Sequence, residues 1–491
     1  MRISRRQLLQ SVGAMCTAVA SERVLSGDDY TKIDGTLVDE SAVTLLARIR
    51  KKEISSHEVV SAFLNRIEQV NGKLNAVVQL RAKEALQEAK ARDKELAKGH
   101  RRGPLHGIPF TVKDSFDTAG MITTAGTQGR SKFVPTSDAT VVARVRAAGG
   151  VLLGKTNTPE LTLSYTTSNR IYGATHNPYD LSRTPGGSSG GAASILAASG
   201  SPLDIGSDSA GSLRVPAHFC GIAALKPSSG RVPRTGHIIS FKGPLQALTH
   251  VGPMARFICD LKLVLPIVAG VDHVDPHIVP KAMKGVTKTL RGLRVAYFSE
   301  NGRCSPSNAT GATLNAVTSA LSSDVASTQR AFPKLLDDAY QLYGKLVAAD
   351  GFDWVTRSLE EANTNPKETT LRMMRRPPKA KTTSEFVALV EQWDSIKSEG
   401  LQFWRDFDVL VCPVTAASAH KHGQPAPKFG FSYSAAINVL GWPSAVVRAG
   451  AGPGGMPIGV QVIAPMWRED RALAVAELIE RKLGGWKPTS L

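Results

Sequence analysis

Apolar positions at helical spacing mark the first patterned part of the chain. Between residues 54 and 70 they fall three or four positions apart, which places them on one face of a helix: Val59, Val60, Phe63, Leu64, Ile67 and Val70. Ser55 and Glu58 form the pattern of a capping box at the start of this helix, and the Asn-Gly pair at 71–72 is expected to end it. A polar, alanine-rich helix is predicted over residues 82–98.

Farther along, short apolar runs alternate with helical stretches. Over residues 103–270 this pattern predicts buried strands at 110–112, 150–154 and 203–206 and helices at 139–148 and 192–199. Around a mostly helical stretch at 311–400, it predicts further strands at 293–298, 407–413, 438–447 and 456–463 and a closing helix at 469–483. Such alternation is typical of layered α/β proteins. We therefore predict a single large α/β domain whose mixed central sheet is covered by helices on both faces.

The composition agrees with a folded, soluble chain. Its 491 residues are 42% hydrophobic and 21% charged. The formal charge is +18, but no run of Lys and Arg is interleaved with stacking aromatic residues, which favours a basic solvated surface over a nucleic-acid-binding protein. The basic run at 372–379 is interpreted in the same way, as a solvated loop. No apolar stretch approaches the roughly 18 residues that a membrane span requires.

The first twenty residues have the features of an export signal. Ser4-Arg5-Arg6 resembles the start of a twin-arginine motif, and the small residues at 18–20 suit a cleavage site. We therefore expect a periplasmic or secreted protein, with a cytoplasmic one as the alternative if this segment is only a basic terminus. The five cysteines are scattered without metal-ligand spacing, so neither a disulfide framework nor a metal site is expected.

Candidate chemistry lies in two glycine-rich loops, at residues 185–191 and 206–214. Each holds a glycine-flanked serine, Ser188 and Ser212, 24 residues apart. Glycine allows a ligand to approach the backbone closely, and successive N–H groups turned toward one point can bind a developing oxyanion. A serine at the end of such a turn is well placed to attack a carbonyl carbon.

A serine nucleophile needs a base, and Lys113 is the leading candidate. It ends the predicted strand at 110–112, and burial disfavours the charged form of a lysine, which lowers its pKa toward neutrality. Asp114 follows directly, but neighbouring strand residues point to opposite faces, so we expect its carboxylate to turn away. Lys155 follows a strand in much the same way and is a rival candidate for the base; only the family resemblance described next favours Lys113 over it.

Several motifs in order resemble the amidase signature family. They are Val112-Lys113-Asp114, the loop at 186–191, the segment at 208–214 and the following stretch at 220–227. The similarity extends from about residue 39 to residue 480. It implies an amidase-signature fold in which Lys113 is the general base, Ser188, preceded by a cis peptide bond, is the relay, and Ser212 is the nucleophile.

The resemblance also implies the rest of the site. The backbone N–H groups of Ser209, Ala210, Gly211 and Ser212 would form the oxyanion hole. Supporting roles are expected for Ser189, Asp208 and Arg214, with the last two bracing the loop. Most members of the family have glycine in place of Ala210, and we interpret the alanine as a change in specificity.

The implied reaction is hydrolysis of a carboxylic amide, linear or cyclic, and of esters as a second class of substrate, without metal or cofactor. The partners are then a small-molecule amide and water, and the bacterial hydrolases of cyclic amides and nylon oligomers are near relatives in this interpretation. The alternative is a catalytically silent amide-binding relative or an amidotransferase subunit. The oligomeric state stays open, with a homodimer as one option.

Two other interpretations of the first loop are less favoured. The pattern G-x-S-x-G at 187–191 matches the nucleophile elbow of α/β-hydrolases and would make Ser189 the nucleophile, but a poor strand precedes it and no histidine is an evident partner. A phosphate-binding P-loop is excluded because no lysine follows the glycines at the required position.

The chain therefore divides, in this interpretation, into a signal peptide, a linker and an amidase domain. Their predicted bounds, including the parts of the amidase domain, are as follows: signal peptide 1–20, linker 21–38, amidase domain 39–485, N-terminal helices 39–100, catalytic core 101–270, variable helical pocket region 311–400, closing strands and helix 401–485.

Overall fold

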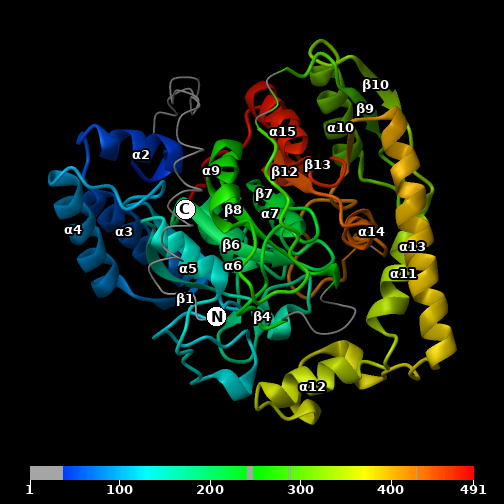
Figure 1. Ribbon diagram of the computed structural model, residues 1–491, viewed down its shortest axis with the longest axis horizontal. Helices are drawn as coiled ribbons and strands as arrows, with labels where there is room; N and C mark the ends of the chain where they lie inside the picture. The colour runs from blue at the N-terminus through cyan, green and yellow to red at the C-terminus, as the bar shows by residue number, and fades with distance from the viewer. Residues whose placement is uncertain (1–36, 240–246, 286, 288, 427) are drawn as a thin grey trace, which may run out of the picture.

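A computed structural model describes residues 37–239, 247–285, 287, 289–426 and 428–491 of the chain (Figure 1). The expected signal peptide at 1–20 and all but the last two residues of the expected linker at 21–38 lie outside the described residues. Among the helices that the structure describes, none combines the length and the apolar character needed to cross a bilayer.

One mixed sheet of eleven strands runs through the described part of the chain. Its order from edge to edge is β1 (Val77–Leu80), β3 (Val151–Thr156), β2 (Pro109–Lys113), β6 (Leu203–Asp208), β8 (His250–Ala255), β7 (Ala223–Lys226), β12 (Ser444–Ala451), β13 (Pro457–Ile463), β11 (Val409–Pro413), β9 (Arg294–Tyr297) and β10 (Ser327–Arg330). The predicted α/β architecture with a mixed central sheet is confirmed.

The direction of the strands places the candidate chemistry at one edge of the sheet. Strand β2 is parallel to both β3 and β6, so the carboxyl ends of these three strands lie at the same edge. Strand β8 is antiparallel to β6 and begins there, with His250 beside Asp208. Ligand sites in α/β proteins form at such carboxyl ends because the loops that leave the strands gather there.

Alternating residues of the central strands bury two separate apolar layers. In β12, Ala445 and Val447 join the core under α9 (Ile258–Val268), α10 (Asn308–Leu321) and α15 (Glu469–Leu483), whereas Val446 faces α6 (Gly190–Ala197) and α7 (Arg214–Cys220). Successive strand side chains point to opposite faces, so one sheet carries both layers. The sheet is therefore covered by helices on both faces, as predicted.

The remaining helices lie around this centre. A third apolar cluster joins α11 (Leu335–Val347), α13 (Thr383–Asp406) and α14 (Ser432–Leu440) at the side of the molecule drawn in yellow and orange in Figure 1. The others are α2 (Ala42–Arg50), α3 (Ser56–Leu74), α4 (Ala82–Ala97), α5 (Thr140–Ala147) and α12 (Asp353–Glu361), with a small hairpin of β4 (Ser168–Asn169) and β5 (Gly173–Ala174).

Several predicted boundaries are wrong. Helix α3 continues past the Asn-Gly pair at 71–72 and ends at Leu74, because Asn75 takes the left-handed conformation that caps it. Strand β1 was expected to be helical, but it pairs with β3 at the sheet edge. Residues 438–440 were expected in a strand, yet they form the last turn of α14, and Gly441 ends the helix before β12 begins.

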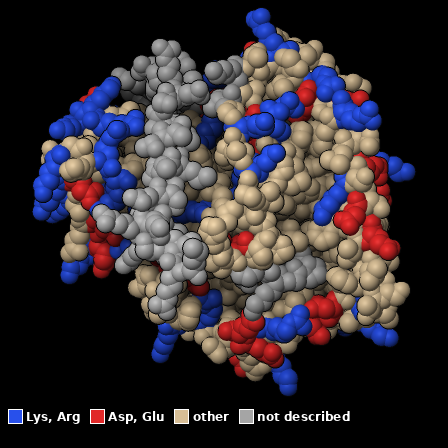
Figure 2. All heavy atoms as spheres, in the orientation of Figure 1, with Lys and Arg blue, Asp and Glu red and all other residues tan. Residues whose placement is uncertain are grey.

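Charged side chains are spread over the visible face of the molecule. Figure 2 shows Lys and Arg scattered between acidic residues rather than gathered into one basic patch on this face. This distribution agrees with the interpretation of the positive net charge as a solvated surface.

Candidate active site

Lys113 is the last residue of β2, and its side chain is completely buried. Its Nζ lies 2.6 Å from Ser188 Oγ and 3.0 Å from Ser207 Oγ. The structure therefore joins the predicted lysine to the first predicted serine, across 75 residues of sequence. Sequence reasoning missed the second hydroxyl, Ser207.

Burial lowers the pKa of Lys113 to about 7. The nearby carboxylates of Asp208 and Asp204 oppose this shift, but they do not cancel it. An ammonium taken out of water loses its hydration, which favours the neutral amine. A large fraction of Lys113 is then neutral near pH 7, and a neutral amine can accept a proton from Ser188.

The first glycine-rich loop packs closely around Ser188. The peptide bond between Gly187 and Ser188 is cis, and the Ser188 carbonyl accepts a hydrogen bond from Thr158 Oγ1 at 3.0 Å. A Cβ added to Gly187 would lie 2.7 Å from the carbonyl oxygen of Ser164, so only glycine fits at this position. Helix α6 begins directly after the loop, which sets the direction in which Ser188 points.

Asp208 organises the second loop from its centre. Its carboxylate accepts hydrogen bonds from Gly211 N at 2.7 Å and Leu213 N at 3.1 Å, and it forms a bidentate pair with Arg214. Burial opposes the ionisation of Asp208, but the charge and hydrogen bonds of Arg214 outweigh it, so its pKa is lowered. The loop thus closes around a fixed negative charge.

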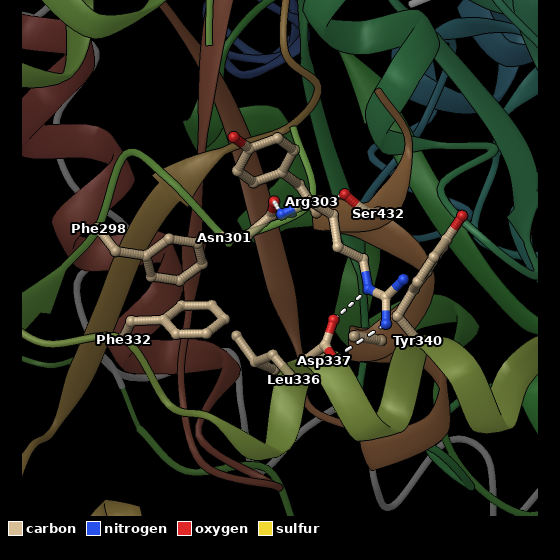
Figure 3. Close-up of a pocket in the computed structure, with 10 residues that line it drawn as sticks. Phe298, Asn301, Arg303, Phe332, Leu336, Asp337, Tyr340 and Ser432 are labelled. Carbon is tan, nitrogen blue, oxygen red and sulfur yellow. Dashed lines mark hydrogen bonds and ion pairs between the residues drawn. The ribbon is translucent and has the colours of Figure 1, made fainter. Parts of the chain in front are cut away.

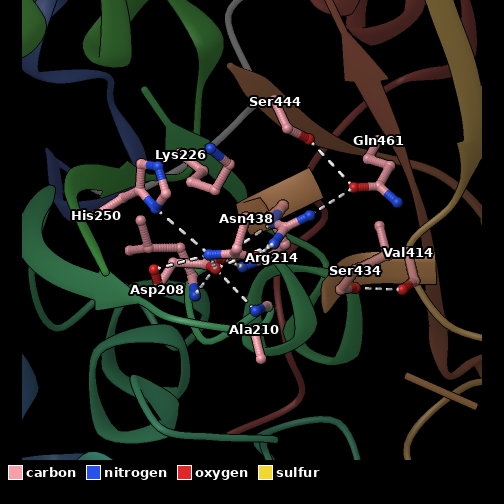
Figure 4. A network of polar contacts seen from close by, with 12 residues as sticks. Asp208, Ala210, Arg214, Lys226, His250, Val414, Ser434, Asn438, Ser444 and Gln461 are labelled. Carbon is pink, nitrogen blue, oxygen red and sulfur yellow. Dashed lines mark hydrogen bonds and ion pairs between the residues drawn. The ribbon is translucent and has the colours of Figure 1, made fainter. Parts of the chain in front are cut away.

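Figure 4 shows how this ion pair is anchored to the closing part of the chain. Asn438 of α14 donates to Asp208 Oδ1 at 2.9 Å, and Arg214 Nη1 donates to Gln461 Oε1 at 3.0 Å. Asp208, Arg214, Asn438 and Gln461 are all fully or almost fully buried. Asn438 and Gln461 were not recognised from the sequence, because both lie more than 200 residues from the loop that they support.

Ser212 follows this braced turn and remains 6% exposed, more than Ser188 or Lys113. The two loops are joined by a hydrogen bond from Ser189 N to the carbonyl oxygen of Ser212 at 3.2 Å. In the described structure the hydroxyls of Ser188 and Ser212 do not form a hydrogen bond. A serine hydroxyl turns about a single bond, and catalytic hydrogen bonds often tighten only when substrate is bound.

The four N–H groups predicted to form the oxyanion hole differ in whether they already donate a hydrogen bond within the protein. Gly211 N donates to Asp208 and is therefore already engaged. The N–H groups of Ser209, Ala210 and Ser212 make no hydrogen bond to another described residue. The Ala210 carbonyl accepts a hydrogen bond from Tyr165 Oη at 3.1 Å. In the peptide between Ala210 and Gly211, the oxygen therefore faces the tyrosine and the Gly211 N–H faces away from it. Three of the four donors are thus not engaged by another described residue.

Gly211 has a conformation that few other residues could adopt here. Its φ is +126°, and an added Cβ would lie 2.7 Å from Ser434 Cβ of α14. Ala210, by contrast, has no positive φ. The alanine found at this position is therefore compatible with the conformation of the loop.

Lys155, the other candidate for the base, lies in β3, and its amine donates hydrogen bonds to the segment that follows β2. Its Nζ donates to Phe116 O at 2.5 Å, Thr118 Oγ1 at 3.1 Å and Thr123 Oγ1 at 2.9 Å. Asp114 lies 3.7 Å from it, on the opposite side from Lys113. The expectation that Asp114 turns away from Lys113 is confirmed, and no serine hydroxyl lies against the Lys155 amine in the described residues.

Ser189, the alternative nucleophile, is fully buried and donates to the carbonyl oxygen of Ser207 at 3.3 Å. The residue preceding α6 is Ser189 itself, and the segment before this loop forms no strand of the described sheet. A nucleophile elbow needs a strand that enters the turn and an exposed serine, so the geometry does not fit one.

Two cavities lined by described residues differ greatly in size, and neither lining includes Lys113, Ser188 or Ser212. A recess between α11 and α14, floored by Phe298, Phe332 and Leu336 and closed by the Arg303–Asp337 ion pair, has room for about one water molecule, ≈ 10 Å³ (Figure 3). A second cavity of ≈ 310 Å³ reaches Thr249, whose hydroxyl lies 2.8 Å from Ser209 Oγ of the oxyanion loop. Of these two cavities, the second is large enough for part of an organic molecule.

Within the described residues, no group of three or more His, Cys, Asp or Glu side chains is arranged to hold a metal ion. Cys220 lies close to Ser212 in sequence, but its thiol is buried, which raises its pKa well above the usual value. The thiol is therefore protonated and packs as a small apolar side chain.

Comparisons with known proteins identify the family of the chain. A family model described as Amidase matches residues 58–473. Fatty-acid amide hydrolase 2 of Homo sapiens is 32% identical, over 98% of this chain and 97% of its own length. A glutamyl-tRNA(Gln) amidotransferase subunit of Alkaliphilus metalliredigens is 30% identical, over 89% of this chain and 95% of its own length. The solved structure of 6-aminohexanoate cyclic dimer hydrolase complexed with substrate superposes with a TM-score of 0.83 at 28% identity, covering 93% of this chain and 99% of the other.

Proposed function

The chain belongs to the amidase family and is an amidohydrolase, and we propose that it cleaves carboxylic amides through an acyl-enzyme formed on Ser212. The single observation that carries this proposal is the buried Lys113 amine, with a pKa of about 7, lying 2.6 Å from Ser188 Oγ. A buried neutral amine against a serine hydroxyl is an activated base.

In the first half of the reaction, Ser212 Oγ attacks the carbonyl carbon of the amide. Its proton passes to Ser188 Oγ while Ser188 gives its own proton to Lys113 Nζ. The carbonyl oxygen becomes an oxyanion, and the N–H groups of Ser209, Ala210 and Ser212 are the donors available to it. The C–N bond then breaks, and the amine leaves with the proton returned along the same path.

In the second half, water takes the place of the amine. It gives a proton to the same relay and attacks the ester carbon of the acyl-enzyme. The bond to Ser212 Oγ breaks, the proton returns to Ser212, and the carboxylic acid is released. Gly211 N–H stays bound to Asp208 throughout and holds the loop in shape.

The substrate class proposed for this chain is small-molecule amides, linear or cyclic, whose C–N bond is not a peptide bond. The similarity to a fatty-acid amide hydrolase supports linear amides, and the similarity to a cyclic dimer hydrolase supports cyclic ones. The cavity of ≈ 310 Å³ is lined in part by Thr249, which is hydrogen-bonded to Ser209, and is large enough for one side of such a molecule. Ala210 adds a methyl group at the oxyanion loop and thereby restricts the space at the reacting carbonyl.

The experiment that tests the proposal is hydrolysis of a graded panel of linear and cyclic amides by the purified chain and by Ser212→Ala. We expect the variant to lose activity by about 10⁴-fold or more while its melting temperature stays unchanged. A fluorophosphonate probe should label the parent chain at Ser212 and leave the variant unlabelled. Turnover by Ser212→Ala at the parent rate would refute the acyl-enzyme.

A component of an amidotransferase is the second candidate, and the 30% identity to such a protein supports it. The two functions differ in what the isolated chain can do. A complete amidohydrolase turns over amides without any other protein, whereas a component that only delivers ammonia needs its partners for full activity. Linear kinetics on several unrelated amides by the purified chain would favour the hydrolase.

Export by the twin-arginine route is a further part of the proposal, supported by the motif at Arg5 and Arg6. Changing both residues, Arg5→Lys with Arg6→Lys, should retain the protein in the cytoplasm of a host that has this route. Undiminished activity of that variant in the periplasmic fraction would count against export.

A further inference from the structure

A chain of polar groups connects Lys113 to a histidine through Ser207. His237 Nε2 lies 3.0 Å from Ser207 Oγ, Ser207 Oγ lies 3.0 Å from Lys113 Nζ, and Lys113 Nζ lies 2.6 Å from Ser188 Oγ. All four side chains are nearly or fully buried. The base is therefore in contact with two hydroxyls, and the second hydroxyl leads to a histidine.

The fold holds His237 firmly against the base. The segment that carries it runs antiparallel to the residues that directly follow β2: Asp117 N donates to Gly236 O at 2.8 Å, and Ile238 N donates to Ser115 O at 2.9 Å. The His237 ring packs on Phe116 with 4.8 Å between ring centroids. Because these contacts begin two residues after Lys113, the histidine and the lysine keep a fixed distance.

The contacts of His237 favour one tautomer over the other. Its Nδ1 lies 3.0 Å from the carbonyl oxygen of Ile239, which can only accept, and 3.2 Å from Ile239 N, which can only donate. The shorter contact favours the tautomer with the proton on Nδ1. Nε2 is then an acceptor and receives the Ser207 hydroxyl proton. Ser207 Oγ, having given its proton to the ring, is left to accept from Lys113, so one N–H of the amine points toward Ser207.

This order of donors restricts where the free electron pair of the amine can lie. A neutral lysine amine has two N–H groups and one lone pair, and one N–H is directed at Ser207. Ser207 therefore cannot occupy the lone pair, which is left for Ser188, the other contact of the amine. With the opposite tautomer, His237 would donate to Ser207, and the Ser207 hydroxyl would instead be free to donate to the lone pair.

We infer that His237 is a positioning residue that acts through Ser207 to keep the lone pair of Lys113 free for Ser188. The inference rests on the proposed function, in which Lys113 is the base. His237 touches neither the substrate nor the relay serine in this role. It contributes by excluding the orientation of the amine in which the lone pair is occupied by Ser207.

The histidine stays neutral while Lys113 changes its charge. Burial, reinforced by Lys113, lowers the pKa of His237 to about 3. The charged groups that face this cluster are Asp204 and Asp208 of β6, Arg234 on the segment of the histidine itself, and Arg130. Above pH 5 the ring therefore keeps its single proton, and the order of donors is preserved.

The first test compares Ser207→Ala, Ser207→Thr and His237→Leu by kcat/KM and by its pH profile. Ser207→Ala and His237→Leu should each lower the plateau by about tenfold, since each removes one orienting hydrogen bond. Ser207→Thr keeps the hydroxyl and should restore most of the activity. The double variant Ser207→Ala with His237→Leu should be no worse than either single variant, because both break the same chain.

The pH profile separates positioning from damage to the fold. Ser207 accepts more strongly from an ammonium than from an amine, so Ser207→Ala should move the acidic limb to lower pH by about half to one unit. His106 is a matched control, because it is buried and bonds only to the backbone at Arg92 and Arg102. His106→Leu should lower the melting temperature and leave the limb in place.

A direct measurement of the tautomer completes the test. In the ¹⁵N spectrum of the full chain labelled at histidine, the resonance that disappears in His237→Leu belongs to His237 and should show a protonated Nδ1. A protonated Nε2, or an unshifted limb with full activity in Ser207→Ala, would overturn the inference while Ser212→Ala remained inactive. Activity that survives in Ser212→Ala would instead overturn the proposed function.

Discussion

Lys113 and Lys155 lie on adjacent parallel strands and are both completely buried, yet they occupy opposite faces of the sheet. In the register of β2 and β3, Lys155 pairs with Val112 and Lys113 pairs with Thr156. A shift of one residue in a strand moves a side chain to the other face. The two lysines are therefore close in the fold but face different surroundings.

Burial acts on both in the same direction, and their partners make the difference. It lowers the pKa of Lys113 to about 7 and that of Lys155 to about 8, with Asp114 opposing the shift of Lys155. Lys155 has three acceptors for its three N–H groups and a carboxylate at 3.7 Å. Lys113 contacts two hydroxyls, and no carboxylate of the described residues accepts a hydrogen bond from it. Burial alone therefore does not make a lysine a base.

The largest difference between the two lysines is expected when each amine is removed in turn. Lys113→Met should lower kcat/KM by about 10³-fold, the size expected for the loss of a general base. Lys155→Met should lower the melting temperature, because Asp114 and three acceptors lose their partner, and should affect kcat/KM far less. Equal losses of activity in the two folded variants would contradict the assignment of the base.

The pH dependence of the unmodified chain tests the difference without mutation. Only neutral Lys113 can accept a proton, and its pKa of about 7 lies far below the usual value for lysine. We expect kcat/KM to fall about tenfold per unit as the pH drops below about 7, and to be constant above it. A profile that stays flat down to pH 5 would show that no group of this pKa is needed.

Lys155 has a carboxylate nearby and Lys113 has no carboxylate as a hydrogen-bond partner, so a carboxylate introduced beside Lys113 tests whether this difference sets its pKa. Ser207→Asp places a carboxylate against the Lys113 amine, which favours its charged form and raises its pKa by about one to three units. At pH 7 the rate should fall by about tenfold or more, and it should recover as the pH is raised toward 9. Ser207→Asn is the uncharged control, and it should not move the acidic limb upward.

The smallest effect on activity is expected from the carboxylate on the other face. Asp114→Asn removes the charge beside Lys155 and should cost about 3 kcal/mol in the free energy of unfolding, measured in urea. Because Asp114 points away from Lys113, kcat/KM should stay within about twofold. A shift of the acidic limb in this variant would mean that the two faces are electrostatically coupled.

Local pattern predicted most of the elements near the site. The strand ending at Lys113, the helix after Ser188 and the strand ending at Asp208 all follow from apolar runs bounded by glycine, and the structure has them with small changes in length. Where prediction failed, a tertiary contact outweighed the local signal. Strand β1 forms because the edge of β3 offers backbone partners, which no local pattern reveals.

The sequence by itself determined the α/β architecture and the two serine loops, because apolar periodicity and glycine-rich spacing are local properties of the chain. The motifs shared with the amidase signature family selected Lys113 over Lys155. Only the tertiary structure decided which partners surround each group. His237, Asn438 and Gln461 reach the site from distant segments, and their roles depend on distances of a few ångströms that strand register and loop packing set. Hydrogen bonding and the electrostatics of buried groups depend on such distances, whereas hydrophobic periodicity does not.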